Sequence, residues 1–320
     1  MPLKAFSRTI MSMASSLEVV VVLDESQKKK ADSVIKSAYA EADRLIGIIN
    51  AWKEGTELYQ VNQLAGIAPL KVCDELFYLV KRSIKISELT GGLFDVTFAS
   101  IDKVWYFDKP LIEIPTPEKI AGSVKNISYK FIQLDEVNKT IFITNKATKI
   151  ELGAIGKGYV ANKMKLKLIS LGIQNGMVNA GGDLTVWGTN QKGEDWRIGV
   201  ADPNKKEDYI AFIPLHNESL ATSGNYERFA IIDGQMYSHI INPKTGYPVR
   251  GIKSVTVLSP DVELCDAIAT SVFLLGVQEG LSFVNRFGDI KCFIVDDQNT
   301  FHYSDNLEQK YYSTANLIHQ

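Results

Sequence analysis

The chain has 320 residues, of which 45% are hydrophobic and 22% charged, and its 35 basic and 37 acidic residues leave a formal net charge of -2. Such a balance supplies no global field to attract nucleic acid or an anionic membrane, so any bound anion must be held locally. No stretch approaches the roughly 20 apolar residues of a membrane-spanning helix. The three cysteines, Cys73, Cys265 and Cys292, are too scattered for a disulfide framework or a CxxC motif. We expect a soluble globular protein with a sizeable core.

The N-terminal part of the chain carries one strand pattern and two helix patterns. The apolar run LEVVVVL, residues 17–23, is typical of a buried strand. Residues 25–50 have apolar side chains at helical spacing and predict a long amphipathic helix. A second helix is predicted over residues 74–92, where it ends at a pair of glycines that can form a left-handed cap.

The pattern changes between about residues 130 and 260, where short β-rich runs alternate with turn residues, as in an antiparallel sheet. These runs are residues 140–144, 182–189, 195–202 and 209–215. Helices are predicted at 157–172, 263–276 and 277–287. Because strands and helices do not alternate regularly, we predict the α+β class, with mixed, mainly antiparallel sheets and packed helices. No repeat or linker divides residues 1–320, so we expect one domain with two lobes.

The predicted helix 263–276 should be buried, yet it carries Asp266 and Thr270 four residues apart. Residues at this spacing lie on one helix face, about 5–6 Å apart at Cβ. Carboxylate and hydroxyl oxygens suit Mg²⁺, which takes one or two carboxylates from protein and completes its octahedron with water and substrate phosphate. The structural alternative is that Asp266 favours the first turn of its helix electrostatically and that Thr270 bonds to a carbonyl of its own helix.

Three glycines surround Lys157 in the segment ELGAIGKGYVA, residues 151–161, just before a predicted helix. Glycine permits close backbone approach to a ligand, and a helix start offers amide donors and the positive end of a dipole, so a phosphate would bind well there. The segment is not a P-loop, because Glu151 stands where a P-loop has glycine and Gly158 follows the lysine. A plain glycine-rich turn is the alternative.

Three further positions combine a polar or aromatic side chain with turn residues. Asp183 follows Gly181 and Gly182, in either a tight turn or a site of close backbone approach. His239 precedes the turn NPKTG and is either a structural donor or a catalyst. Trp52 lies in a polar loop, where it either stacks on a flat ligand or packs onto the core.

Taken in order, eight segments of the chain resemble the FAD:protein FMN transferase family, the ApbE-type flavin transferases. They are MAS (13–15), NAW...TELYQVN (50–62), GGLFDVT (91–97), ELGAIGKGYVAN (151–162), NAGGDLTVWG (179–188), ATSGNYERF (221–229), SHIINPKTGYPV (238–249) and CDAIATSVFLLG (265–276). The resemblance runs from about Met13 to Asp296, and the number and order of the segments make it specific. It implies the family's two-lobed, T-fold-like architecture.

The resemblance also implies which residues form the site. In the family, Mg²⁺ is held by an aspartate and a threonine of the last motif and by a backbone carbonyl of the glycine-rich motif, which are here Asp266, Thr270 and Ala154. Lys157 would stabilise charge on the leaving phosphate, and His239 is the candidate base for the acceptor hydroxyl. The positions that contact FAD, with Trp52 as the aromatic beside the isoalloxazine, fall on Met13, Trp52, Leu93, Phe94, Asp95, Glu151, Lys157 and Ile240.

Five positions depart from the family's usual motifs. The family's MGT is Met13–Ser15 here, with alanine in place of glycine, so the backbone is less free. Glu151 replaces a common aspartate, and Ala154 replaces a common glycine, which is harmless if only its carbonyl is used. Trp52 stands where tyrosine is frequent and keeps a flat aromatic face. None of these departures removes a predicted metal ligand.

The function that the resemblance implies is Mg²⁺-dependent transfer of the FMN moiety of FAD, the substrate, to a Thr or Ser hydroxyl of an acceptor protein, with release of AMP. Acceptors in this family are subunits of membrane redox complexes or flavin-dependent reductases. Two alternatives stay open: a Mg²⁺-dependent FAD pyrophosphatase that gives FMN and AMP, and a non-catalytic flavin-binding protein. The family implies the bacterial cell envelope, periplasmic or anchored at the inner membrane if a lipoprotein signal was removed, and otherwise the cytoplasm.

Overall fold

An eight-stranded sheet forms the centre of the molecule in the computed structural model, which describes residues 2–107, 114–205, 207–225, 229–232 and 235–307. The strand order is β1-β2-β6-β7-β10-β13-β14-β15, and each neighbouring pair is antiparallel. The strands are β1 Leu3–Ser12, β2 Ser15–Asp24, β6 Gly176–Ala180, β7 Asp183–Trp187, β10 Ser219–Gly224, β13 Ile252–Ser259, β14 Lys291–Asp296 and β15 Phe301–Tyr303.

Three small antiparallel sheets and the helices surround this centre. The small sheets are β3 (Leu70–Lys71), β5 (Thr140–Ile143) and β4 (Ile132–Asp135); β8 (Trp196–Ala201) and β9 (Tyr209–Leu215); and β11 (Phe229–Ile232) and β12 (Gln235–Ser238). The α-helices are α1 Lys28–Ile49, α2 Glu57–Gln63, α3 Asp74–Leu89, α4 Pro117–Ser123, α5 Gly156–Ser170, α6 Val262–Leu275 and α7 Val277–Val284. Short 3₁₀ turns span Glu25–Gln27, Phe98–Ser100 and Tyr129–Phe131.

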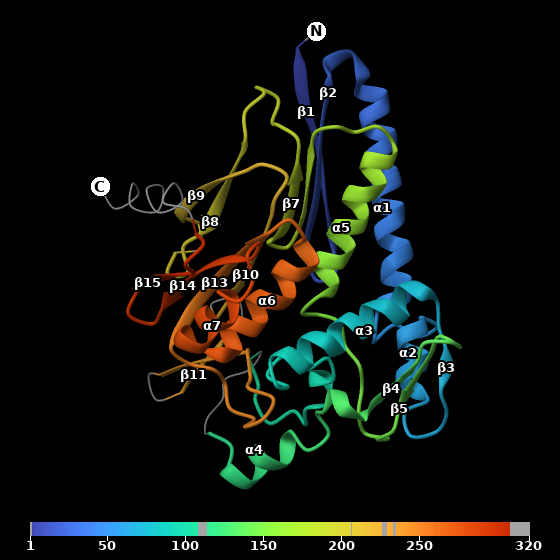
Figure 1. Ribbon diagram of the computed structural model, residues 1–320, viewed down its shortest axis with the longest axis vertical. Coiled ribbons are helices and arrows are strands. Elements are labelled where there is room, and N and C mark those ends of the chain that lie inside the picture. The colour runs from blue at the N-terminus through green and yellow to red at the C-terminus, as the bar shows by residue number, and fades with distance from the viewer. Residues whose placement is uncertain (1, 108–113, 206, 226–228, 233–234, 308–320) are drawn as a thin grey trace.

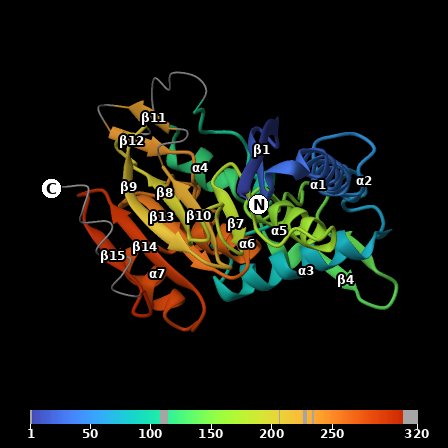
Figure 2. The ribbon, with the colours of Figure 1, turned by 90° about the horizontal axis from the view of Figure 1, so that it is seen from above.

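The central sheet is covered on both faces, which explains the continuous apolar run of β2. Successive side chains of a strand point to opposite faces. Val19 and Val21 therefore pack in the core beneath α1 and α5, whereas Val20 and Val22 pack with Trp196 in the core beneath the β8–β9 hairpin. Figures 1 and 2 show α1, α5, α6 and α7 along one face of the sheet. A strand buried on both sides needs no polar alternation.

The structure confirms the predicted α+β class and the helices at α1, α3, α5, α6 and α7. It adds β1, an edge strand whose mostly exposed and mixed sequence gave no strand signal. Among the described residues, none of the helices is both long enough and apolar enough to cross a membrane.

Helix α6 is a core helix, as the sequence predicts. Asp261 caps its start by accepting a hydrogen bond from the Glu263 backbone N–H at 2.9 Å, and Gly276 ends it with a φ of 87°. Cys265, Ala269 and Phe273 bury one face against β13 and β14. Val262 and Ala267 pack in the core that contains α5, and Asp266 and Thr270 are turned toward the site described below.

The β1–β2 hairpin turns at Met13 and Ala14, which have φ values of 51° and 57°. Both residues are therefore left-handed, as a two-residue hairpin turn with this twist requires. A residue with a Cβ loses roughly 1–2 kcal/mol in this conformation. Alanine at this position, noted above as a departure from the family, is thus strained in the turn.

We expect Ala14→Gly to raise the free energy of unfolding by about 0.5–1 kcal/mol, because the relieved strain exceeds the entropy cost of a glycine. Urea denaturation of the two proteins measures the difference. Ala5→Gly, in the extended part of β1, is the control and should lower stability by about 0.5–1 kcal/mol. Equal effects of the two substitutions would show that the turn is not strained.

Candidate functional site

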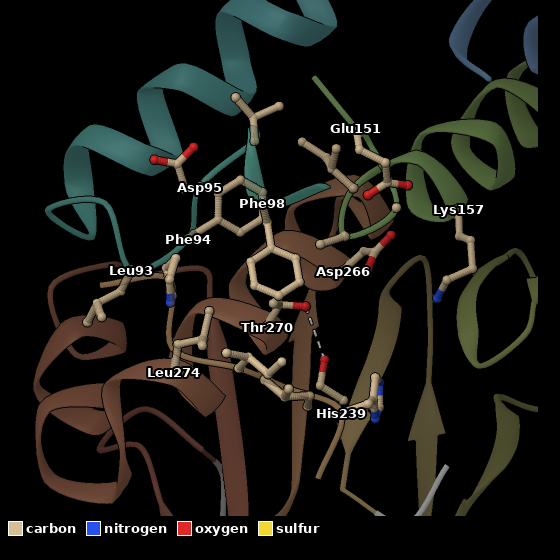
Figure 3. A pocket seen from close by; sticks show the side chains of 18 of the residues that line it. Leu93, Phe94, Asp95, Phe98, Glu151, Lys157, His239, Asp266, Thr270 and Leu274 are labelled. Atoms are coloured by element: carbon tan, nitrogen blue, oxygen red, sulfur yellow. Dashed lines mark hydrogen bonds between the residues drawn. The ribbon is translucent and has the colours of Figure 1, made fainter. Parts of the chain in front are cut away.

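A pocket lies where α6, the end of β10 and three loops meet (Figure 3). The loops are residues 93–98 after α3, 151–155 before α5, and 239–243 after β12, and Lys157 lines the pocket from the first turn of α5. In Figure 3 the side chains of Glu151, Lys157 and Asp266 lie to the right, while the apolar Leu93 and Leu274 lie to the left. One end of the pocket therefore gathers charged side chains, and the other is lined mainly by apolar ones, with the Asp95 carboxylate above Leu93.

Asp266 and Thr270 both face this pocket from α6, as their spacing predicts. Asp266 is only 4% exposed, and its Oδ2 accepts a hydrogen bond from the Gly158 backbone N–H at 3.1 Å. Gly158 belongs to the first turn of α5, so the carboxylate satisfies an amide at the start of a neighbouring helix. Asp261 caps α6 itself, so the cap of this helix does not depend on Asp266, and the role of Asp266 as a metal ligand stays a prediction.

Lys157 supplies the positive charge of the pocket. Its Nζ forms an ion pair and a hydrogen bond with the Asp183 carboxylate, which is 2% exposed at the start of β7. The pairing with a carboxylate from the sheet fixes the direction of a long, flexible side chain. A lysine side chain that is already ordered in this way loses less conformational entropy when it binds a phosphate.

Burial raises the pKa values of three acids that line the pocket, Asp95, Glu151 and Asp266. Burial raises the pKa of Asp266 above its ordinary value, although Lys157 and the Gly158 amide act in the opposite direction. Burial also raises the pKa of Glu151, and the charge of Asp266 adds to that shift. Carboxylates that are costly to ionise in the free protein are stabilised when a cation binds beside them.

The donors of the pocket fit a hard divalent cation. Asp266 and Thr270 offer a carboxylate and a hydroxyl oxygen, and Ala154, which also lines the pocket, offers a backbone carbonyl. Across the described ranges no cluster of three or more His, Cys, Asp or Glu side chains is arranged to hold a metal ion. A set with one carboxylate leaves several coordination positions for water or substrate phosphate, as Mg²⁺ prefers.

The loop after α3 forms one wall of the pocket through Leu93 and Phe94. Asp95 holds this loop in place: its carboxylate accepts hydrogen bonds from the Thr97 backbone N–H at 2.8 Å, the Thr97 hydroxyl at 2.6 Å and the Tyr129 backbone N–H at 2.9 Å. The structure thus gives Asp95 a structural role in the wall. Its contact with FAD stays a prediction.

The loop after β12 forms the opposite wall. His239 and Ile240 line the pocket, and Ile241 and Pro243 continue it. The NPKTG turn that follows is anchored by Trp105, whose indole N–H donates to the Gly246 carbonyl at 2.8 Å. His239 is therefore placed in the pocket, as a base would need to be, and its catalytic role stays a prediction.

Met13 and Trp52 lie in a second cavity that adjoins the pocket. This cavity lies between the tip of the β1–β2 hairpin, the end of α1 and the start of α5, and it shares Glu151, Gly153 and Lys157 with the first. The Trp52 side chain is 63% exposed, and the Lys149 Nζ lies 5.8 Å from its ring centroid. An exposed ring beside a cavity fits a stacking platform better than a residue packed onto the core.

All predicted site residues therefore line one of two joined cavities. Among the lining residues that the sequence did not assign, three are of interest. Asp183 stood after a glycine pair and was left open between a turn and an approach site. Ser223, at the end of β10, had only a small-residue motif as a signal. Phe98 was not assigned, because in the sequence an apolar residue that lines a pocket looks the same as one that is buried in the core.

Glu263 lies one turn before Asp266 on α6 and is 1% exposed. The Arg82 Nε lies 3.1 Å from its Oε1, although not in hydrogen-bonding geometry. Burial raises the pKa of Glu263 from 4.5 to about 7. The folded protein therefore keeps a proton that the unfolded chain loses between these two values, and stability falls as the pH rises through this window.

We expect Glu263→Gln to remove this fall, which amounts to about 3 kcal/mol at 1.36 kcal/mol per pKa unit. The variant should be more stable than the parent at pH 8 and similar to it near pH 4.5. Thermal melts across this pH range test the expectation, with the exposed Glu54→Gln as the control. Parallel stability curves for Glu263→Gln and the parent would contradict it.

The fold is of mixed α+β architecture, and comparison with known proteins places it in an enzyme family. The family model described as ApbE family matches residues 13–294. An FAD:protein FMN transferase of Vibrio cholerae is 31% identical over 263 residues, covering 79% of this chain and 77% of the relative. One of Haemophilus influenzae is 28% identical over 291 residues, covering 88% and 82%. The crystal structure of the ApbE protein from Thermotoga maritima superposes with a TM-score of 0.84 at 28% identity, covering 94% of this chain and 97% of that one.

The chain belongs to the ApbE family, because the family model covers most of its length. This confirms the predicted resemblance and, with the superposition, the predicted architecture.

Proposed function

We propose that this protein transfers the FMN moiety of FAD to a Thr or Ser hydroxyl of an acceptor protein, with Mg²⁺ as the metal and AMP as the second product. Several relatives carry the name FAD:protein FMN transferase, which supports flavin transfer as the activity. The observation that carries the proposal is the joining of two cavities at Lys157: a pocket with a buried carboxylate and a half-buried hydroxyl on one side, and an exposed tryptophan on the other.

The two cavities fit the two parts of FAD on this proposal. The isoalloxazine would stack on Trp52 in the second cavity, and the diphosphate would lie near Lys157, where the cavities meet. Asp266, Thr270 and the Ala154 carbonyl would hold the Mg²⁺. When bound, the ion supplies positive charge to the diphosphate oxygens. The AMP half would then occupy the apolar end, beside Leu93 and Phe94.

The reaction needs a proton acceptor and a stabilised leaving group. The acceptor oxygen forms a bond to the phosphorus of the FMN half, the bond from that phosphorus to the bridging oxygen breaks, and AMP leaves with the bridging oxygen. His239 takes the hydroxyl proton, and the Lys157 ammonium stabilises the negative charge that develops on the leaving phosphate. Asp183 keeps that ammonium directed at the pocket.

The acceptor would present an extended segment at the pocket. Its identity as a subunit of a redox complex or a flavin-dependent reductase, and the cell envelope as the place of action, stay predictions from the family resemblance.

Mass spectrometry of the protein incubated with FAD, Mg²⁺ and a Thr-bearing acceptor peptide tests the proposal. We expect an FMN-sized mass gain on the peptide and equimolar AMP, both absent with a Thr→Ala peptide. FMN and AMP formed equally without the peptide would replace the transferase by a pyrophosphatase. Intact FAD under every condition, with FAD bound to the protein, would leave a flavin-binding protein.

A further inference from the structure

The hydroxyl of Thr270 makes a contact that is unusual for a threonine inside a helix. Its Oγ1 lies 3.3 Å from the Ser223 Oγ at the end of β10, and either atom can be the donor (Figure 3, dashed line). Among the described residues this is the only hydrogen bond of the Thr270 hydroxyl. The next residue, Ser271, behaves in the common way and donates to the Ala267 carbonyl of its own helix at 2.7 Å.

The position of Ser223 follows from the packing of α6 on the sheet. Ala221, two residues earlier on β10, is fully buried in the core that also contains Ile268 and Ala269 of α6. Residues two apart on a strand share a face, so Ser223 also faces α6. Thr222 lies between them and bonds instead to Thr256 on β13 at 2.9 Å. The sheet thus holds one hydroxyl opposite Thr270.

A threonine hydroxyl that binds a cation still needs a hydrogen-bond acceptor for its proton. A hydroxyl has one proton and two lone pairs, and a bound cation takes a lone pair. The proton must then be donated away from the cation, and a fixed acceptor determines which way the lone pair points. Ser223 is the acceptor that the structure provides.

We propose that Ser223 is a positioning residue that accepts the Thr270 proton and thereby turns the Thr270 lone pair into the pocket, where it binds the divalent cation together with Asp266. The inference rests on the proposed function for the presence of the cation. It assigns to the sheet, through β10, a part in a metal site whose side-chain ligands are both on α6.

The test is the affinity for Mn²⁺ alone, measured by the loss of the free Mn²⁺ signal in electron paramagnetic resonance. We expect Ser223→Ala to raise the Kd by about 10–100-fold, the usual range for a partner that orients a ligand. Ser223→Thr, which keeps the hydroxyl, should bind nearly as well as the parent. Ser271→Ala is the matched control, since it removes a neighbouring buried hydroxyl that bonds within its helix, and it should change the Kd by less than about twofold.

A double-mutant cycle separates positioning from a general structural effect. Thr270→Val should weaken Mn²⁺ binding at least as much as Ser223→Ala, and adding Ser223→Ala to it should have no further effect. Additive losses, or an unchanged Kd in Ser223→Ala while Thr270→Val binds weakly, would overturn the role of Ser223 alone. If the parent binds no Mn²⁺, or if Thr270→Val binds like the parent, the metal assignment in the proposed function fails and the inference fails with it.

Discussion

Asp266→Ala and Asp266→Asn are both expected to lower kcat for FMN transfer by about 10²–10⁴-fold, while FAD binding in the apolar part of the pocket is retained. The estimate corresponds to the several kcal/mol that a bound metal contributes to stabilising charge in the transition state. Asp266 is the one carboxylate in the predicted ligand set, and neither alanine nor asparagine supplies a negative charge to hold the cation.

The two variants are expected to differ in the stability of the folded protein. The Asp266 carboxylate also accepts the Gly158 N–H at the start of α5. Asparagine keeps an oxygen at that place, whereas alanine leaves a buried amide without its acceptor, which costs about 1–3 kcal/mol. Steady-state transfer assays and thermal melts should therefore show equal losses of activity but a lower melting temperature for Asp266→Ala only. Transfer by Asp266→Asn at the rate of the parent would rule out the role given to the carboxylate.

Gly158→Ala is expected to destabilise the protein by about 1–3 kcal/mol, the range for inserting a methyl group into a packed contact. A Cβ at Gly158 would lie 2.5 Å from the Val262 carbonyl oxygen, 2.8 Å from the Glu263 Cα and 3.0 Å from the Asp266 Cβ. Two of these are backbone atoms of α6, so α5 and α6 would have to separate. In an ordinary helix, the same substitution would stabilise by up to about 1 kcal/mol.

The separation of the two helices should also displace Asp266, so transfer activity should fall together with stability in Gly158→Ala. Gly156→Ala is the matched control on the same helix, because its Cβ would meet only the Ile49 Cδ1 at 3.4 Å and the Leu152 Cβ at 3.8 Å. We expect its unfolding free energy, measured by urea denaturation, to stay within about 1 kcal/mol of the parent. A Gly158→Ala protein as stable as Gly156→Ala would show that the contact between α5 and α6 is not tight.

The sequence predicts those parts of the site that a local pattern reveals, and it does not by itself predict contacts between distant segments. Asp266 and Thr270 could be paired from spacing alone, because a helix has a fixed period and the helix itself was evident from its apolar run. Lys157 could be singled out because glycines surround it. That these residues share one pocket with Leu93 and His239 follows from the family resemblance, since no local pattern reports contacts between segments that lie 27 to 177 residues apart.

The parts that the sequence did not predict depend on tertiary pairing. Asp183 is the partner of Lys157, but an acid after two glycines gives the same local pattern in a plain turn. Ser223 meets Thr270 only because β10 packs against α6, and the local sequence does not report this packing. The strand β1 was missed for a related reason. It is an exposed edge strand, so its sequence does not need the alternation of apolar and polar residues by which a strand is recognised.

The order in which the site's segments occur along the chain has a consequence for biosynthesis. The pocket takes its first lining residue from Leu93 and its last from Leu274, and both side chains of the predicted metal site lie on α6, near the end of that interval. A nascent chain that has not yet released α6 from the ribosome therefore lacks Asp266 and Thr270 and has no closed pocket. On the proposed function, the divalent cation would bind only after α6 has left the ribosome, and it would not assist the early stages of folding.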